Sequence, residues 1–439
     1  MTGFEIGLLS VLAILILIYA GMYVPVALGL VSFLAVWYLR DGLEAPVYLV
    51  TLAASNGLED YVFGVIPLFV LMGLLVSHAE MGRDIYQVAN QLLNRIRGGL
   101  GVATVAANAV FAAITGVSIA SASVFTRVAV PEMIRFGYTP RFAVGVVAGS
   151  SVLGMLIPPS VMLIIYAIIT EQSVAALFKA GVIPGILLAL AYVVAIMVMA
   201  TFFKGFVGEP KEHADDADAS DRLSTRQLLG KTSPLIVLIL LVLGGIYGGV
   251  FTPTEAGAVG ALGALIIAAL KKRLDRTVLW QVLVETGHIV ASILLLIVAA
   301  TMYSRMLGIS GLPNELGEWI ASANIGFYGI LTVYVLLLIV LGTILDTTSI
   351  ILIMVPLFIP ILDPYNINLV WFGIITIVGA EIGLLTPPLG ISCYVIKSTL
   401  SDDRISLYDI FAGAAPFAVI MLLVLLLLIA FPSLSLVLV

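Results

Sequence analysis

Two apolar stretches interrupted by prolines decide the fold: Gly149-Ser-Ser-Val-Leu-Gly-Met-Leu-Ile-Pro-Pro-Ser160 and Gly379-Ala-Glu-Ile-Gly-Leu-Leu-Thr-Pro-Pro-Leu-Gly390. In each stretch, two consecutive prolines remove backbone amide donors and an upstream glycine weakens the helix, so carbonyl groups lose their intrahelical partners. Such carbonyls are costly inside a membrane, where water cannot replace the missing donors. We therefore expect two broken transmembrane helices, at about 142–169 and 368–396, whose carbonyl oxygens bind a cation.

The rest of the chain has the composition of a helical membrane protein. Of its 439 residues, 62% are hydrophobic and only 10% are charged, and apolar runs long enough to cross a bilayer recur from end to end. These runs lack the alternation of barrel strands, so we predict an all-α polytopic membrane protein in a lipid bilayer. The chain has no basic face with interleaved aromatic residues, which excludes nucleic-acid binding. One cysteine and three histidines exclude zinc, haem and iron–sulfur sites.

Two further apolar segments, about 99–136 and about 325–362, are too long for a single span. Each is interrupted near its middle by Gly, Ser, Thr or Asp, so we predict re-entrant helical hairpins that enter and leave the membrane on the same side. The remaining long apolar runs predict continuous spans at about 4–20, 22–39, 62–79, 174–203, 234–250, 255–270, 280–304 and 409–437.

The hydrophilic connector 204–233 divides the chain into two halves, 1–203 and 234–439, which resemble each other in order. Val130-Pro131 in the first half corresponds to Val355-Pro356 in the second, and the two proline breaks correspond likewise. An odd number of predicted crossings separates equivalent points, so we expect two inverted-topology repeats, the common plan of secondary transporters. If the hairpins do not cross, the Lys- and Arg-rich loops lie on one side with the connector, and that side is predicted to be cytoplasmic.

The two hairpin tips, Thr115–Ser123 and Gly342–Ser349, are rich in small hydroxyl residues. Hydroxyl oxygens there can complete the coordination shell of a sodium ion, and the N-termini of the half-helices offer positive dipole ends to a carboxylate. Two simpler interpretations remain open. The hydroxyls could donate to carbonyls of their own helix, or small residues could merely allow close packing.

Several ionisable residues fall inside apolar segments, where they are costly. We expect Asp346 and Arg305 to line the substrate path, and Glu381 either to join them or only to accept a hydrogen bond from a nearby donor. Arg127 and Glu132, on the outgoing arm of the first hairpin, are expected to form a structural pair.

At these motifs the chain resembles the large membrane subunit of tripartite ATP-independent periplasmic (TRAP) transporters, the DctM family. The resemblance covers nearly the whole chain. It is carried by Ile66-Pro-Leu-Phe-Val-Leu-Met-Gly73, the serine-rich tip near Ser118, Val130-Pro-Glu-Met133, Leu156-Ile-Pro-Pro-Ser160, Lys179-Ala-Gly181, Gly342 with Leu345-Asp346, and Ile382-Gly-Leu-Leu-Thr-Pro-Pro388.

The resemblance implies a sodium-driven elevator transporter of the bacterial inner membrane. It would import an organic anion, such as a C4-dicarboxylate, a sugar acid, sialic acid or a similar carboxylate, by symport with Na+. A periplasmic substrate-binding protein would deliver the anion, and a small four-helix membrane subunit would be the membrane partner.

Sodium is the only metal ion that the resemblance implies, at two sites. The first site would be formed by Ser118, Ser121, Ser150, Ser151, Leu153, Gly154 and Met155, the last five within a stretch that contributes carbonyl oxygens. The second site would be formed by Gly342, Thr343, Gly383 and Thr386. Asp346 matches an aspartate that looks important for transport in relatives, and Arg305 is near a substrate-side arginine of some relatives.

Other functions fit the sequence less well. A stand-alone sodium-coupled anion symporter with a related architecture differs only in needing no partner subunits. An intramembrane protease would need a paired catalytic set, and Asp346 has no second aspartate in a matching motif. A passive channel or an assembly scaffold would not need two equivalent ion-binding breaks. We therefore expect a transporter and no enzymatic activity.

Overall fold

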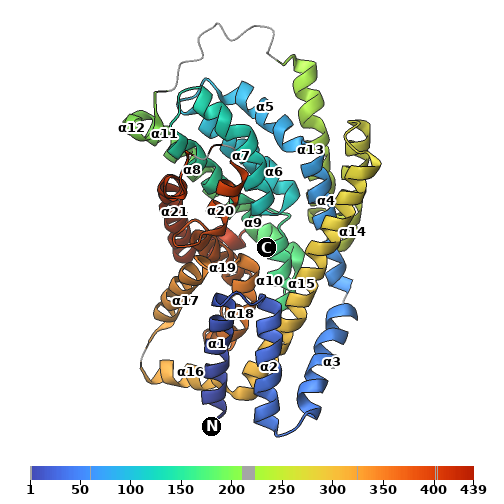
Figure 1. The fold of residues 1–439 in the computed structure, drawn as a ribbon, viewed down its shortest axis with the longest axis vertical. Coiled ribbons are helices and arrows are strands. Elements are labelled where there is room, and N and C mark those ends of the chain that lie inside the picture. The colour runs from blue at the N-terminus through green and yellow to red at the C-terminus, as the bar shows by residue number, and fades with distance from the viewer. Residues whose placement is uncertain (1, 60, 210–222, 324, 401, 403) are drawn as a thin grey trace.

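The computed structural model describes residues 2–59, 61–209, 223–323, 325–400, 402 and 404–439, and these fold almost entirely into helices (Figure 1). This confirms the all-α polytopic membrane fold. Among the described residues, seven helices are long and apolar enough to cross a membrane, or eight if the bent pair Pro140–Leu156 and Val161–Ile169 counts as one span. The helices at 3–19, 24–40 and 369–384, which we predicted to cross, are shorter than that criterion.

The first half of the chain places one hairpin and one broken helix between longer helices. Its elements are α1 (Gly3–Tyr19), α2 (Val24–Arg40), α3 (Glu44–Glu59), η1 (Tyr61–Gly64), α4 (Val65–His78), α5 (Met81–Leu93), α6 (Gly99–Thr115), α7 (Ser118–Arg135), α8 (Pro140–Ser151), α9 (Leu153–Leu156), α10 (Val161–Ile169), α11 (Val174–Phe202) and α12 (Lys204–Val207).

The second half follows the same order of elements from α15 onward. Its elements are α13 (Thr225–Tyr247), α14 (Pro253–Leu270), α15 (Arg276–Ser310), α16 (Leu312–Ser322), α17 (Phe327–Gly342), α18 (Thr347–Leu362), η2 (Asp363–Tyr365), α19 (Leu369–Leu384), α20 (Ile391–Thr399), α21 (Leu407–Ala430) and α22 (Ser433–Leu436). In each half a long helix precedes a short amphipathic helix, α5 or α16, and a pair of apolar helices follows.

Both predicted hairpins are pairs of helices with the expected bounds. The break between α6 and α7 falls at Gly116 and Val117, and the break between α17 and α18 falls at residues 343–346. Figure 1 shows the first pair toward the end of the molecule that carries the connector, and the second pair toward the end with the N-terminus. The opposite placement agrees with inverted repeats, although the inversion itself stays a prediction. By length and composition, α18 with η2 could also cross a membrane alone.

Both predicted helix breaks occur at the Pro-Pro pairs. The helix α9 ends at Leu156 and α10 begins at Val161, while α19 ends at Leu384 and α20 begins at Ile391. The peptide bonds Pro158–Pro159 and Pro387–Pro388 are both cis, so the two breaks share a backbone feature as well as a sequence.

Some elements differ from the prediction. We did not predict α3, α5 or α16, because the sequence was searched for long apolar runs. Residues 210–222 of the connector lie outside the described residues. The helix α13 already begins at Thr225, so Arg226 and Lys231 lie on a helix and not in a solvated loop.

One buried carboxylate ties α5 to the second half of the chain. Asp84 accepts hydrogen bonds from Lys231 Nζ at 3.0 Å, Lys271 Nζ at 2.6 Å and Arg273 at 3.2 Å. Burial by itself would raise the pKa of Asp84, but Lys271 and Lys231 together hold this pKa below its ordinary value. The cluster fixes the first turn of α5 against α13 and the loop that follows α14.

Close backbone contact joins the two halves again at α8 and α21. A Cβ atom at Gly145 would lie 2.2 Å from the carbonyl oxygen of Gly413, so only glycine allows this crossing. Arg141 and Asp409 form an ion pair of 2.8 Å beside it.

Candidate functional site

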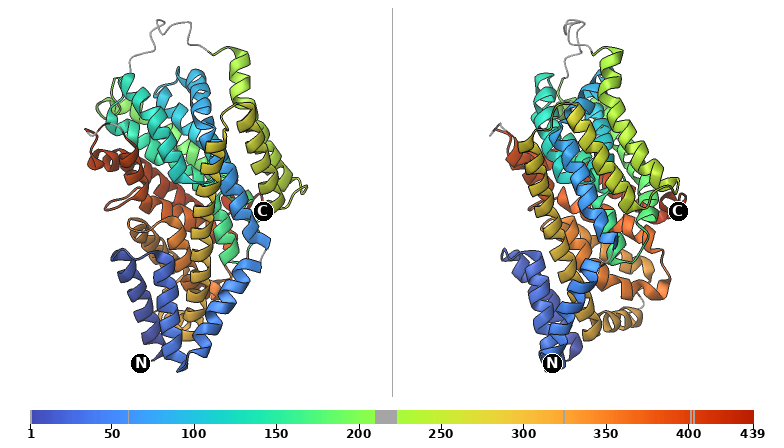
Figure 2. Two further views of the ribbon diagram at one scale, coloured as in Figure 1. Left: turned by 45° about the vertical axis from the view of Figure 1, so that its right-hand side comes forward. Right: turned by 90° about the vertical axis from the view of Figure 1, so that its right-hand side faces the viewer.

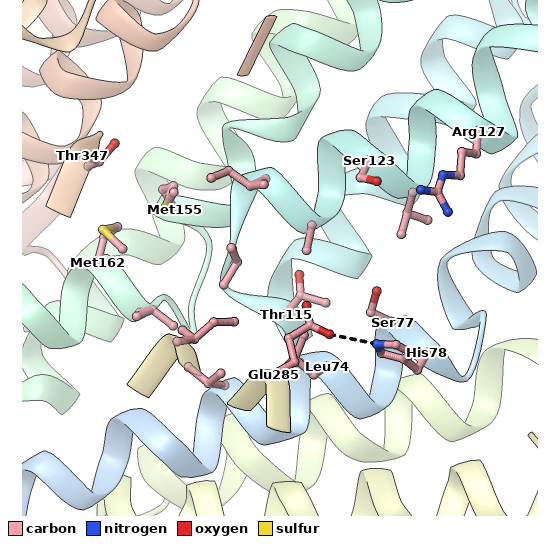
Figure 3. Close-up of a pocket in the computed structure, with 18 of the residues that line it drawn as sticks. Leu74, Ser77, His78, Thr115, Ser123, Arg127, Met155, Met162, Glu285 and Thr347 are labelled. Atoms are coloured by element: carbon pink, nitrogen blue, oxygen red, sulfur yellow. Dashed lines mark hydrogen bonds and ion pairs between the residues drawn. The ribbon is translucent and has the colours of Figure 1, made fainter. Parts of the chain in front are cut away.

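A cavity of about 1320 Å³ lies between the two halves. Its wall comes from α4, α5 and α15 on one side and from α7, α10 and the start of α18 on the other (Figure 3). Figure 3 shows Ser123 and Arg127 of α7 on the wall opposite Glu285 and His78, which are 3.2 Å apart. Both outgoing hairpin helices therefore reach one shared space.

The tip of the first hairpin rests directly on the first helix break. The backbone carbonyl of Gly116 accepts a hydrogen bond from the amide of Val161 at 3.4 Å. A Cβ atom at Gly116 would lie 2.6 Å from the carbonyl oxygen of Pro159, which is too close for any side chain. Gly116 also has a φ of +62°, a backbone conformation that favours glycine. Gly154 faces the other side of the tip, with the Val117 carbonyl carbon 3.3 Å from where its Cβ would be.

Three of the predicted first-site hydroxyls are brought together inside the protein. Ser118, Ser121 and Ser150 are fully buried. Ser121 Oγ donates to Asn108 Oδ1, and Asn108 Nδ2 donates to Ser150 Oγ at 2.6 Å. Ser118 Oγ has no hydrogen-bond partner among the described residues. A buried hydroxyl without a partner costs free energy, so Ser118 is suited to a ligand that supplies one.

The other predicted members of the first site are partly occupied. Ser151 Oγ donates to the carbonyl of Ala148, three residues earlier in its own helix, at 2.8 Å. The carbonyl of Leu153 accepts from the amide of Ile157 at 2.8 Å, and that of Met155 accepts from Ser160 Oγ at 2.5 Å. A carbonyl oxygen has two lone pairs, so these bonds leave one acceptor position on each.

The second hairpin tip meets the second break in the same manner. The carbonyl of Thr343 accepts from the amides of Leu389 and Gly390 at 3.2 and 3.1 Å. A Cβ atom at Gly383 would lie 2.4 Å from the Cα of Gly342. The hydroxyls of Thr343 and Thr386 both donate to carbonyls of their own helices, at 2.8 and 2.7 Å. Their protons are therefore occupied, and the lone pairs of both oxygens stay available to coordinate an ion.

Two acidic residues flank the start of α18. Asp346 is its N-cap residue, accepts from the amide of Ser349 at 3.2 Å and lines the cavity. Glu381 is fully buried, and its Oε1 accepts from the Thr347 hydroxyl at 2.6 Å, so it does have the nearby donor that we considered. Its Oε2 has no partner among the described residues.

The structure separates Arg305 from this site. Arg305 does not line the cavity, and it lies roughly 20 Å along α15 from Ser292, which does. Arg127 instead lines the cavity, as does Glu132, and the ion pairs of the described residues do not include one between these two side chains, so the predicted structural pair is wrong. Glu132 accepts from Asn90 at 2.7 Å.

Two further polar features were missed by sequence reasoning. Asn108 is an uncharged polar residue inside the apolar segment 99–115. Because a buried amide needs hydrogen-bond partners, its presence there could have predicted a polar contact inside the protein. The pair of His78 and Glu285 joins α4 to α15, and no local sequence pattern links two residues so far apart.

Solved structures of two transporters share this fold. The YdaH transporter of Alcanivorax borkumensis aligns with a TM-score of 0.60 over 90% of both chains, at 14% sequence identity. MtrF of Neisseria gonorrhoeae aligns with a TM-score of 0.59 over 88% of this chain and 84% of that chain, at 11% identity. At these identities the similarity is one of fold alone, an all-helical polytopic membrane fold.

Sequence comparison identifies the family. The profile of the tripartite ATP-independent periplasmic transporter, DctM component, matches residues 11–434. The chain therefore belongs to the DctM family of transporter permeases, which makes it a multi-pass protein of the bacterial inner membrane and not an enzyme.

Relatives in this family carry names with different substrates. The chain is 34% identical to the C4-dicarboxylate TRAP transporter large permease protein DctM of Pseudomonas aeruginosa, over 86% of each chain. It is 31% identical to the sialic acid TRAP transporter large permease protein SiaM of Vibrio cholerae, over 96% of this chain and 95% of that protein.

Proposed function

We propose that the chain is the large permease subunit of a sodium-coupled TRAP transporter that imports an organic anion. A periplasmic substrate-binding protein delivers the anion, and a small four-helix membrane subunit completes the membrane complex. One observation carries this proposal: each hairpin tip rests on a proline break, and the first junction leaves Ser118 Oγ buried without a partner.

Sodium is the ion that suits both junctions. They offer neutral oxygens, from carbonyls and hydroxyls, and hard cations prefer such ligands. The proposed first site uses Ser118 and Ser121 with backbone oxygens of the first break, and the second uses the tip at Gly342 and Thr343 with the break at Gly383. A bound ion would hold each tip against its break, because the ligands come from both.

The proposed anion is a carboxylate that binds in the cavity between the hairpins. The helix α7 begins at the cavity without a side-chain cap, and its N-terminus favours negative charge. The N-terminus of α18 also lies at the cavity, but the carboxylate of Asp346 already caps it. Arg127 adds a positive charge on the same wall. The relatives named for C4-dicarboxylates and for sialic acid both carry carboxylate substrates, which supports this class without choosing within it.

The proposed mechanism is alternating access by an elevator movement of two inverted repeats. The hairpins and broken helices would move together with the bound ions and anion, against a frame that includes α1, α2, α13 and α14. The repeated order of elements and the opposite placement of the hairpins support this mechanism.

Uptake into proteoliposomes tests the proposal. The liposomes would contain the full-length chain and the small subunit, with candidate binding proteins outside, with and without an inward sodium gradient. We expect uptake only when sodium and a binding protein are both present, and we expect Ser118→Ala to reduce it at least tenfold at low sodium. The matched control is Thr126→Val, because Thr126 is a buried hydroxyl on the same helix that donates to the carbonyl of Ala122.

Two results would contradict the proposal. Uptake that persists without any binding protein would assign the chain to the stand-alone symporters. Uptake that does not respond to sodium would remove the assignment of the two junctions as sodium sites.

A further inference from the structure

We propose that Asn108 is a positioning residue of the first sodium site, which turns the hydroxyl of Ser121 so that its lone pairs face the ion. This inference rests on the proposed sodium coupling and extends it to a residue that does not itself touch the ion.

The hydrogen bonds around Asn108 fix the orientation of its side chain. Ser150 Oγ donates its only proton to the carbonyl of Val146 at 2.7 Å, so the group that faces Ser150 must be a donor. The Nδ2 atom of Asn108 therefore points to Ser150, at 2.6 Å, and Oδ1 points to Ser121. Asn108 is fully buried, so no water competes for these bonds.

Ser121 differs from the buried threonines of this hairpin. Thr104, Thr115 and Thr126 all donate to the carbonyl four residues earlier in their own helix, which is the usual arrangement in apolar helices. Ser121 instead donates across to α6. The O–H bond of Ser121 therefore points away from α7 toward Asn108. The hydrogen bond to Asn108 thereby fixes the direction of the Ser121 lone pairs.

The orientation of a hydroxyl decides whether it can bind a cation. A serine oxygen carries one proton and two lone pairs, and only the lone pairs attract a positive ion. Ser118 lies three residues before Ser121 on the same face of α7, and Ser118 Oγ is the buried atom without a partner. Asn108 thus holds the hydroxyl of Ser121 in an orientation in which it can bind the same sodium ion as Ser118.

The second hairpin has a similar arrangement. Thr347, in the first turn of the outgoing helix α18, also donates to a buried side-chain oxygen, Glu381 Oε1, at 2.6 Å. Glu381 belongs to the broken helix, whereas Asn108 belongs to the ingoing arm of the hairpin. Both halves therefore orient a first-turn hydroxyl through a buried side-chain acceptor.

Sodium-dependent thermal stability of the purified full-length chain tests this role without relying on transport. We expect Asn108→Leu, which has a similar volume and no polar atoms, to weaken sodium affinity about tenfold, the effect of losing one oriented ligand, so that about ten times more sodium is needed for the same rise in unfolding temperature. The dependence of the unfolding temperature on the logarithm of the sodium concentration should keep its slope at high sodium. Asn108→Asp keeps the acceptor for Ser121, and the hydroxyl of Ser150 can turn its proton from the carbonyl of Val146 to the second carboxylate oxygen, so this variant should bind sodium at least as tightly as the wild type.

The matched control is Thr104→Val on the same helix, because Thr104 is equally buried and its hydroxyl donates to the carbonyl of Leu100 at 2.7 Å, with Met133 Sδ at 3.8 Å, and contacts no residue of the proposed sodium site. We expect its sodium response to equal that of the wild type. In sodium-driven uptake, Asn108→Leu should raise the half-saturating sodium concentration by the same factor and leave the maximal rate intact.

A double-mutant cycle separates positioning from general packing. If Asn108 acts through Ser121, then Asn108→Leu causes no further loss of sodium affinity in a Ser121→Ala background. Equal losses in both backgrounds would overturn the inference, as would a wild-type sodium response in Asn108→Leu. If Asn108→Leu does not fold, weaker sodium binding by Asn108→Asp would overturn it. A wild-type chain that shows no sodium response would instead contradict the proposed function.

Discussion

Individual side chains at the cavity combine structural and proposed transport roles, and Asp346 shows how the two can be separated. Its carboxylate caps α18 by accepting from the amide of Ser349, and it also faces the cavity. A cap is retained by asparagine and lost with alanine, whereas the negative charge is lost with either. Loss of activity in an alanine variant alone would therefore not identify the role of the carboxylate.

We expect Asp346→Asn and Asp346→Ala to reduce sodium-driven uptake by at least tenfold, because both lack the charge. Only Asp346→Ala should lower the free energy of unfolding, by about 1 kcal/mol for the lost cap. Uptake assays and thermal unfolding of both variants measure the two effects.

The control for this pair is Asp275→Asn. Asp275 caps α15 by accepting from the amide of Val278 at 2.7 Å, and it does not line the cavity. Normal uptake by Asp346→Asn would show that the carboxylate serves only as a cap.

At the scale of elements, the sequence predicted where helices break better than how they face one another. The breaks at Pro158-Pro159 and Pro387-Pro388 were predictable because missing amide donors act within a few residues. The hairpin bounds were predictable because each long apolar segment is interrupted near its middle by Gly, Ser, Thr or Asp. The amphipathic helices α5 and α16 were missed, since their polar faces interrupt the apolar runs.

The candidate site was predictable only in part. The hydroxyls at Ser118 and Ser121 were found because they cluster at a hairpin tip. The position of Arg305 relative to the cavity was not predictable. The helix α15 has 35 residues, and the sequence alone does not say which part of so long a helix lies beside the cavity. The roles of Asn108 and Arg127 depend on the rotation of α6 and α7 about their axes, which is set by tertiary packing.

The amphipathic helix α5 depends on Asp84 for its attachment to α13 and the loop after α14. We expect Asp84→Asn to lower the free energy of unfolding at pH 7 by on the order of 2 kcal/mol, because three cations lose a buried partner. This value is below that of a fully buried pair because the cations are partly exposed. Asp402→Asn, which breaks the exposed pair with Arg404, should have no measurable effect.

The pH dependence of this effect has a definite sign. The folded-state pKa of Asp84 is below the ordinary value of 3.8, so its contribution is fully present above that value and is lost as the pH falls through the folded-state pKa. The difference in unfolding temperature between wild type and Asp84→Asn should therefore be constant from about pH 8 to pH 5 and shrink only below about pH 4. A difference that disappears near pH 6 would assign the effect to a histidine.

On the scale of the whole molecule, the lining of the cavity extends toward the side of the connector. It reaches Glu80 and Arg83 on α5, and Gln91 of the same helix exchanges two hydrogen bonds of 2.9 Å with Leu223 at the end of the connector. Figure 2 shows α5, in light blue, on the same side as the connector in both views. If the connector is cytoplasmic, as its charges predict, this end of the cavity lies on the cytoplasmic side, and we expect the cavity to be reached from there.

Thiol labelling tests this orientation. The single native cysteine, Cys393, is buried, so an introduced cysteine provides the signal. We expect Ser123→Cys, on the cavity wall, to react with a membrane-impermeant reagent in inside-out vesicles and not in right-side-out vesicles. Ser121→Cys is the control, because Ser121 is two residues away and fully buried. Reaction only in right-side-out vesicles would reverse the orientation.

The glycine contact between α8 and α21 restricts how the permease can divide into moving parts. Gly145 belongs to the first half of the chain and Gly413 to the second, and their backbones touch with no room for a side chain. The ion pair of Arg141 and Asp409 closes the same crossing. The two sequence halves therefore cannot slide past each other as separate blocks. Any rigid body that travels across the bilayer must be assembled from pieces of both, so the mechanical boundary of the molecule does not coincide with the connector that separates the two halves of the sequence.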